Sequence, residues 1–284
     1  MMNAWTYGVD TISNLPCNVL DGILGCLPWK DAVKTNILSK YWRYKWVTRQ
    51  QLDFNDEFFK SFKQDEEAKR IIYQVLLLHK GSILQFRLQG RSFTSCPDID
   101  HWIHFLTKKN VQEFTLHYLE LQHCLFHPPQ GFKGFEKLIN LRLKYVTFVP
   151  SIITNLISKS PLLERLRLCC PPTALNNIKY LKFLTMSLRN VKEVSGDVYL
   201  ITSCPKLQHL TIEFDSSGIN VEGVVQFLRA QSFLYGALKL QRVQVNTFMG
   251  LEMEMEFIKF ILASAPVLEE IFFWNFSYLG VRSG

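Results

Sequence analysis

The sequence predicts an α/β fold in which a small all-helical N-terminal region precedes a curved array of strand–turn–helix units. Short apolar alternations recur along most of the chain, amphipathic helical patterns separate them, and the N-terminal part shows helical spacing alone. The chain has 284 residues, of which 48% are hydrophobic. A chain of this length can bury roughly three quarters of the surface that it exposes when unfolded, so a substantial core is available.

The N-terminal helical region is expected over residues 10–52, after a disordered tail at residues 1–9. Its pattern is read from residues 12–46, ISNLPCNVLDGILGCLPWKDAVKTNILSKYWRYKW. Pro16 suits the first turn of a helix, where its missing N–H costs little. Apolar residues follow at helical spacing, and Pro28 ends the segment.

A second helix is expected to begin near Lys30 or Asp31, and the negative charge of Asp31 suits a helix N-terminus. It would carry two apolar rows, one of which can pack on the first helix. The other row has no obvious partner within so short a segment, and exposed rows of that size usually mark a protein–protein surface. Packing on the residues that follow is the alternative, and the sequence leaves both open. The first row is Val33, Ile37, Tyr41 and Tyr44, and the second is Leu38, Trp42 and Trp46.

Residues 53–80 are expected to form a charged connector with a first helix starting near Asp65, and repeats follow. Eight segments each contain an apolar-x-apolar pair, whose second members lie 28, 27, 25, 18, 26, 33 and 28 residues apart. Most intervals are close to the roughly 20–29 residues of a leucine-rich repeat, and the 18-residue interval predicts a shortened or missing repeat. The segments are 83–88, 111–116, 138–143, 162–168, 181–186, 207–212, 240–245 and 268–273.

Three of these segments share a longer motif. They read SPLLERL (160–166), CPKLQHL (204–210) and APVLEEI (265–271). The proline ends the preceding helix, and a strand follows shortly afterwards. Units of this size cannot bury themselves singly, so they are expected to stack into a curved solenoid with parallel strands on its concave face.

The N-terminal pattern resembles an F-box, and more narrowly the F-box of a large plant group that also has leucine-rich repeats and a C-terminal FBD region. The resemblance continues through residues 76–88, 97–106 and 126–143, and residues 238–274 are similar to the first part of an FBD region. It implies repeats over 81–239 and a truncated FBD-like region over 240–284, because the family usually adds a further helix. The motifs that carry it are Leu15-Pro16, Ile23-Leu24, Leu27-Pro28, Asp31-Ala32-Val33, Leu38-Ser39-Lys40, Trp42-Arg43 and Trp46.

In that family the F-box binds a Skp-family adaptor, which joins a cullin–RING ubiquitin ligase. The resemblance therefore implies a substrate receptor whose repeats bind a target protein. We expect it to be non-catalytic and without a cofactor, and to act in the cytoplasm or nucleus. A repeat scaffold outside any ligase, or a degenerate copy with a non-functional F-box, is the alternative. The residues expected to contact the adaptor are Leu15, Pro16, Ile23, Leu24, Leu27, Pro28, Val33, Leu38, Trp42 and Trp46.

Patterns of catalytic or metal-binding residues are weak. The sequence contains neither a GxSxG motif nor a Gly-rich loop before a helix. Four possible ligands cluster, but a second pair with finger-like spacing is missing, so no metal site is expected. Seven cysteines without a CxxC motif fit a reducing compartment. The clustered residues are His117, His123, Cys124 and His127.

Charge and hydropathy bear on the partners. No secretion signal and no membrane-spanning stretch are evident at the sequence level. The net charge of +7 is spread along the chain, which favours an ordinary solvated surface over nucleic-acid binding. Glu252, Glu254 and Glu256 are expected to be solvated, with an acidic partner-binding strip as the alternative.

The middle residue of each apolar-x-apolar pair points away from the core. Arg87, Arg142 and Arg167 occupy such positions and could form a basic stripe along the concave face. That stripe would favour an acidic target, and ordinary solvated strand faces are the alternative.

Overall fold

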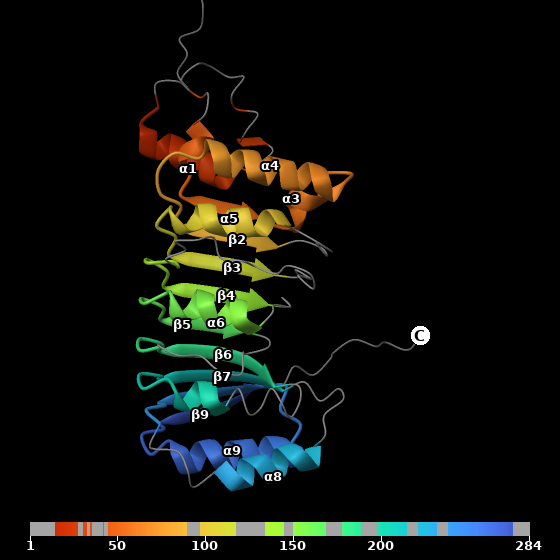
Figure 1. Cartoon of the computed structure of the whole chain (residues 1–284), viewed down its shortest axis with the longest axis vertical. Coiled ribbons are helices and arrows are strands. Elements are labelled where there is room, and N and C mark those ends of the chain that lie inside the picture. Colours follow the sequence, from red (N-terminus) through yellow and green to blue (C-terminus); the bar gives the residue numbers. More distant parts are fainter. Residues whose placement is uncertain are drawn as a thin grey trace, which may run out of the picture.

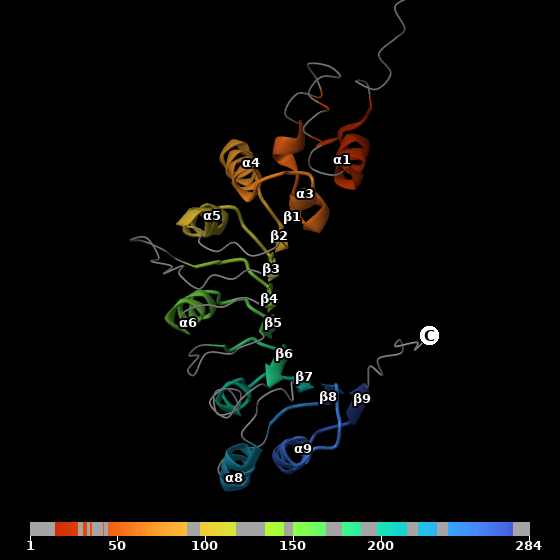
Figure 2. The same cartoon turned by 90° about the vertical axis from the view of Figure 1, so that its right-hand side faces the viewer.

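The computed structural model describes residues 15–27, 31, 32, 35, 42, 45–89, 97–117, 134–144, 150–168, 178–188, 198–214, 221–231 and 238–274. Within these residues the strands form one nine-stranded sheet, in which each strand pairs in parallel with the next along the chain. The sheet curves, with α4, α5, α6 and α8 on its convex side (Figure 2). The predicted α/β solenoid with parallel strands on its concave face is confirmed. The expected tail at residues 1–9 lies outside the described residues.

The strands are β1 (Gln51–Phe54), β2 (Gln85–Gln89), β3 (Glu113–His117), β4 (Asn140–Lys144), β5 (Arg165–Leu168), β6 (Phe183–Leu188), β7 (His209–Phe214), β8 (Arg242–Asn246) and β9 (Glu270–Trp274). The helices are α1 (Cys17–Cys26), the 3₁₀ helix η2 (Lys45–Thr48), α3 (Asp56–Lys60), α4 (Asp65–Leu78), α5 (Pro97–Thr107), α6 (Pro150–Ser158), α8 (Val221–Gln231) and α9 (Glu252–Ser264). Helices α1, α3 and α4 lie at one end of the array, and α8 and α9 lie at the other (Figure 1).

All eight predicted apolar pairs lie in strands β2 to β9, and the sheet register aligns them into two continuous rows. Strand β1 was not predicted, although Leu52 and Phe54 show the same alternation and are fully buried. The charged residues that follow β1 led to the assignment of residues 53–80 as a connector. At the last strand, Phe273 is 50% exposed because no further described strand covers that edge.

The shared small-Pro motif folds identically in its three copies. In each copy the backbone N–H of the leucine three residues after the small residue donates to that residue's carbonyl, at 3.2 Å. The small residues Ser160, Cys204 and Ala265 are all buried. A larger side chain at this position would have to displace core residues. Burial therefore explains why all three copies have a small residue there.

The 18-residue interval does not interrupt the sheet. Strands β5 and β6 pair directly, with Arg165 opposite Phe183 and Leu166 opposite Leu184. Direct pairing across this short interval agrees with the shortened repeat that the sequence offered as one alternative, and residues 169–177 lie outside the described part of the chain.

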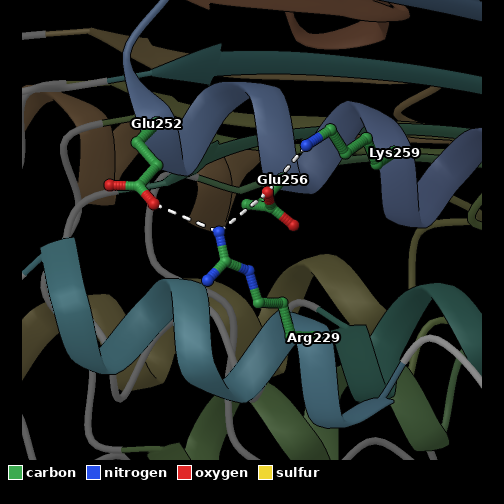
Figure 3. A network of polar contacts seen from close by, with 4 residues as sticks. All are labelled: Arg229, Glu252, Glu256 and Lys259. Atoms are coloured by element: carbon green, nitrogen blue, oxygen red, sulfur yellow. Dashed lines mark hydrogen bonds and ion pairs between the residues drawn. The ribbon is translucent and has the colours of Figure 1, made fainter.

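The two C-terminal helices are joined by an ion network (Figure 3). Arg229 on α8 donates to Glu252 at 3.1 Å and to Glu256 at 3.2 Å, and Lys259 contacts Glu256 at 2.8 Å. Hydrogen bonds from these cations lower the pKa of the Glu256 carboxyl. Glu252 remains exposed, as expected from the sequence.

Glu254 corrects the expectation that all three glutamates are solvated, because its side chain is completely buried. It is the third residue of α9, and its carboxylate accepts hydrogen bonds from the backbone N–H groups of Met249 and Leu251, at 2.9 and 3.0 Å. Helix N-termini leave such N–H groups without helical partners, and a glutamate at this position can satisfy them. Residue type alone did not reveal this capping role.

Four phenylalanines form a spine through the first repeats. The ring centroids of Phe54 and Phe86 lie 5.9 Å apart, those of Phe86 and Phe114 5.7 Å, and those of Phe114 and Phe135 5.3 Å. Each ring is at most 1% exposed. Aromatic pairs at this separation add to the stabilisation from burial, so Phe114 couples three successive repeats.

Phe114→Ala is expected to lower the free energy of unfolding by about 3–5 kcal/mol, because it removes a buried ring from the spine. Urea unfolding followed by circular dichroism measures the loss. Thr115→Ala, on the opposite face of the same strand, serves as the control and should change stability by about 0.5 kcal/mol or less. A loss below about 1 kcal/mol for Phe114→Ala would contradict the spine's role.

The buried Cys204 is expected to resist labelling. Burial raises the pKa of its thiol to about 12, whereas Cys17 and Cys26 are exposed. Iodoacetamide at pH 8, followed by peptide mapping, should therefore modify Cys17 and Cys26 but not Cys204 until the chain is unfolded. Ionisation of the unfolded thiol begins at lower pH, so the stability contributed by the buried thiol should fall as the pH rises from 9 towards 12.

Candidate functional site

Helix α1 presents opposite sides to the core and to solvent. Leu20 and Leu24 are fully buried, while Val19 and Ile23 are 41% and 39% exposed. Residues four apart lie on the same side of a helix, so Val19 and Ile23 form an exposed apolar pair. Pro16, just before the helix, is also exposed. We call Pro16, Val19 and Ile23 the α1 surface.

Arg49 fastens the end of α1 to the repeat array. Its guanidinium donates to the carbonyl oxygens of Gly25, at 3.1 Å, and Leu27, at 3.3 Å. The last carbonyls of a helix have no helical donors, so these bonds cap α1. The Arg49 carbonyl lies 2.8 Å from Nε2 of His79. Burial lowers the pKa of Arg49, and Asp53 partly opposes this effect.

Both tryptophans of the expected adaptor-binding row are buried. Trp42 is 2% exposed and Trp46 is 4% exposed, and both belong to the core cluster that contains Leu20 and Leu24. Trp46 lies in the 3₁₀ helix η2, so the α-helical spacing used to define the row does not extend through it. In this structure Trp42, Trp46 and Leu24 are covered by the chain itself.

The remaining expected contacts divide into three groups. Pro16 and Ile23 are exposed, whereas Leu15 and Leu27 are partly buried against the core. The other three, Pro28, Val33 and Leu38, lie outside the described residues. Val19 was not expected as a contact, although its helical spacing with Ile23 was visible in the sequence.

A cavity of about 420 Å³ lies between α1, α3 and β1. Its lining includes Arg49, Asp53 and Asn55. Burial raises the pKa of Asp53, and the neighbouring Arg87 opposes that shift through an ion pair of 2.9 Å. The cavity is therefore polar on one side.

The strand register places the expected basic residues on one row of the concave face. Arg142 lies directly opposite Arg167 on adjacent strands. Arg87 lies two strands from Arg142, with Thr115 between them, and is paired with Asp53. The structure thus brings Arg142 and Arg167 together but separates Arg87 from them.

Three neighbours of that pair were not predicted. Arg165 lies two residues before Arg167 on β5, with its guanidinium carbon 4.9 Å from the centre of the Phe183 ring. That ring stacks on His209 at 4.5 Å, with an interplanar angle of 3°. Burial, followed by the charge of Arg242, lowers the pKa of His209. Only the register of three strands reveals this grouping.

The described residues lack both a metal-binding cluster and a membrane-spanning helix. Among them, no group of three or more His, Cys, Asp or Glu side chains could hold a metal ion. His123, Cys124 and His127 of the weak ligand cluster lie outside this part, as does the side chain of His117. None of the helices described is both long and apolar enough to cross a membrane.

Two family models match the chain. The model described as "At1g61320/AtMIF1, LRR domain" matches residues 103–195, and the FBD model matches residues 238–273. The first match runs from the second half of α5 past β6, and the second covers β8, α9 and all but the last residue of β9. The N-terminal helical region lies outside both matches.

Curated relatives from Arabidopsis thaliana are similar over longer stretches. F-box/FBD/LRR-repeat protein At1g13570 is 39% identical over 56% of this chain and 44% of its own length. F-box/LRR-repeat protein At3g26922 is 31% identical over 72% of this chain and 59% of its own length. F-box/FBD/LRR-repeat protein At3g52680 is 27% identical over 90% of this chain and 51% of its own length. The chain thus spans about half the length of these relatives. No solved structure matches it.

Arg49→Met is expected to loosen α1 without disturbing the far end of the array, because two helix-terminal carbonyls lose their donor. Hydrogen exchange of the peptide covering residues 20–27 should become at least about tenfold faster, while exchange in β7 and β8 stays unchanged. Arg229→Met, which removes an arginine at the opposite end, is the control. Unchanged exchange in α1 of the Arg49 variant would contradict the anchoring role.

Proposed function

We propose, from the premise that the chain belongs to the plant family of F-box/FBD/LRR-repeat proteins, that it is a substrate-receptor subunit of a Skp–cullin–F-box ubiquitin ligase. Its N-terminal helices bind a Skp-family adaptor, and through the adaptor a cullin. Its repeats bind a target protein. It acts in the cytoplasm or nucleus.

The observation that carries this proposal is the α1 surface. A helix anchored by two buried leucines on one side keeps two aliphatic side chains half exposed on another. Covering such an apolar surface with a partner removes it from water and so lowers the free energy of the complex. The buried tryptophans then support α1 from beneath, and the adaptor contact is carried by Pro16, Val19 and Ile23 with the partly buried Leu15 and Leu27.

The protein supplies no reacting group in this proposal. It holds the target near the ligase, which raises the effective concentration of target lysines at the site of ubiquitin transfer. Arg49 links α1 to the array next to β1, and the concave face belongs to the sheet that begins there, so the adaptor and the target are held at a fixed separation. The function therefore depends on the rigidity of the array as much as on either surface.

A repeat scaffold outside any ligase is the second candidate. The burial of Trp42 and Trp46 favours it, because the internal packing of these large rings leaves a smaller apolar surface for an adaptor. The two candidates differ in one measurable property, the affinity for a Skp-family adaptor.

Val19→Asp combined with Ile23→Asp is expected to weaken adaptor binding by at least about tenfold, because charged groups replace two central contacts of the interface. Biolayer interferometry with a panel of purified plant Skp-family adaptors measures the affinity.

Met255→Asp combined with Leu262→Asp is the matched control. These α9 residues are 43% and 55% exposed, so the change in charge and exposed apolar surface is similar at the opposite end of the array. The control should bind adaptors like the wild type, and circular dichroism should show that both variants fold. If the folded wild type binds no adaptor of the panel, the scaffold function replaces the ligase function.

A further inference from the structure

We propose that the middle of the concave face, centred on Arg142, Arg165 and Arg167, binds an extended Asp/Glu-rich segment of the target protein. We call these three residues the arginine triad. That the bound protein is presented for ubiquitin transfer rests on the proposed function.

The register brings three guanidinium groups onto one small area of the sheet. Arg142 and Arg167 are direct neighbours on β4 and β5, and Arg165 lies opposite Asn140 on the same face. Adjacent strands are about 4.8 Å apart, and residues two apart along a strand are separated by about 6.6 Å. Arg142 and Arg165 are exposed, and Arg167 is partly exposed. Like charges this close repel one another, so an anion that binds between them is stabilised.

Arginines elsewhere on the same face are already neutralised by the sheet. Arg87 pairs with Asp53 on the adjacent strand at 2.9 Å, and Arg242 pairs with Glu270 on the adjacent strand at 3.1 Å. In the described part of the chain, by contrast, no carboxylate forms an ion pair with any member of the arginine triad. The face therefore carries three uncompensated cations between two compensated ones.

The neutralised pairs also indicate which anion fits. In both, the partner is a carboxylate presented from a neighbouring strand at ion-pair distance. An extended acidic segment lying across β4 and β5 can present carboxylates in the same way. Because Arg165 and Arg167 are two residues apart, acidic residues at alternate positions match their spacing.

An aromatic platform borders the arginine triad. Phe183 and His209 are both partly exposed and stack on each other next to Arg165, whose guanidinium lies over the Phe183 ring. This contact holds Arg165 in place before a ligand arrives, which lowers the entropy lost on binding.

The surroundings favour a short acidic peptide over a nucleic acid. Glu113 lies on β3, diagonal to Arg142, and Glu213 lies on β7 of the same sheet face. A phosphate backbone continuing along the face would meet these carboxylates on either side of the arginine triad, and nucleic-acid binders instead use an extended basic surface. A carboxylate segment that spans only β4 and β5 avoids both.

Fluorescence anisotropy with the purified full chain tests the proposal. The probe is a fluorescein-labelled ten-residue peptide of alternating Glu and Ser, and the comparison probes are the Gln–Ser analogue, a phosphoserine–Gln analogue and a ten-nucleotide single strand. We expect the Glu–Ser peptide to bind, the Gln–Ser peptide to bind at least about tenfold more weakly, and the affinity to fall with added salt.

Arg142→Glu combined with Arg167→Glu should weaken binding of the Glu–Ser peptide by at least about tenfold. Arg142→Gln combined with Arg167→Gln should cause a smaller loss and provides a test if the reversed charges disturb folding. Arg70→Glu combined with Lys259→Glu, on the convex helices α4 and α9, changes the net charge equally and should leave binding unchanged.

Three results would overturn the proposal: no binding of the Glu–Ser peptide by the wild type, an equal loss in the convex control, or tighter binding of the phosphoserine peptide or the oligonucleotide. The Arg142/Arg167 variants should still bind a Skp-family adaptor like the wild type. If the wild type binds an adaptor but not the Glu–Ser peptide, the proposal for the arginine triad fails and the proposed ligase function is unaffected. If the wild type binds the peptide but no adaptor, only the proposed ligase function fails.

Discussion

The whole array depends on a backbone ladder that links each repeat to the one before it. Just ahead of each strand from β3 onward, a backbone N–H donates to the carbonyl at the equivalent position of the preceding repeat, through residues 84, 112, 139, 164, 182, 208, 241 and 269, with distances of 2.8–3.0 Å. This chain of bonds fixes the register, and the register aligns the apolar pairs into buried rows. Each repeat contacts chiefly its neighbours, so a destabilising substitution in one repeat affects mainly the adjacent repeats.

The same register decides what the concave face presents. Side chains one position away from the buried rows form parallel rows of their own, and their chemistry changes along the array. At the start of the exposed row, Asp53 on β1 forms an ion pair with Arg87 on β2. The middle of the concave face carries the arginine triad and the stacked pair of Phe183 and His209. A slip of one residue in any strand would place these charges in the core, so the packing that stabilises the solenoid also specifies the binding face.

The N-terminal helices use the array as a support. Arg49 caps α1, and both tryptophans are buried in the core to which Leu20 and Leu24 of α1 belong. The buried leucines of α1 and the Arg49 hydrogen bonds hold this helix in place, which leaves Val19 and Ile23 on a defined outer surface. An interface built on such a support loses less entropy on binding than one on a mobile helix.

The sequence by itself determined the repeat array, because apolar alternation and the small-Pro turns are local patterns that pack in only one way. It also located α1, but it could not assign the tryptophans to an inner or outer surface, since that depends on where the chain turns after α1. Glu254 was misjudged for a related reason: its burial follows from a helix terminus that lies against the core. Only the tertiary structure decided which arginines are neutralised, because the partners of Arg87 and Arg242 come from neighbouring strands about thirty residues away along the chain.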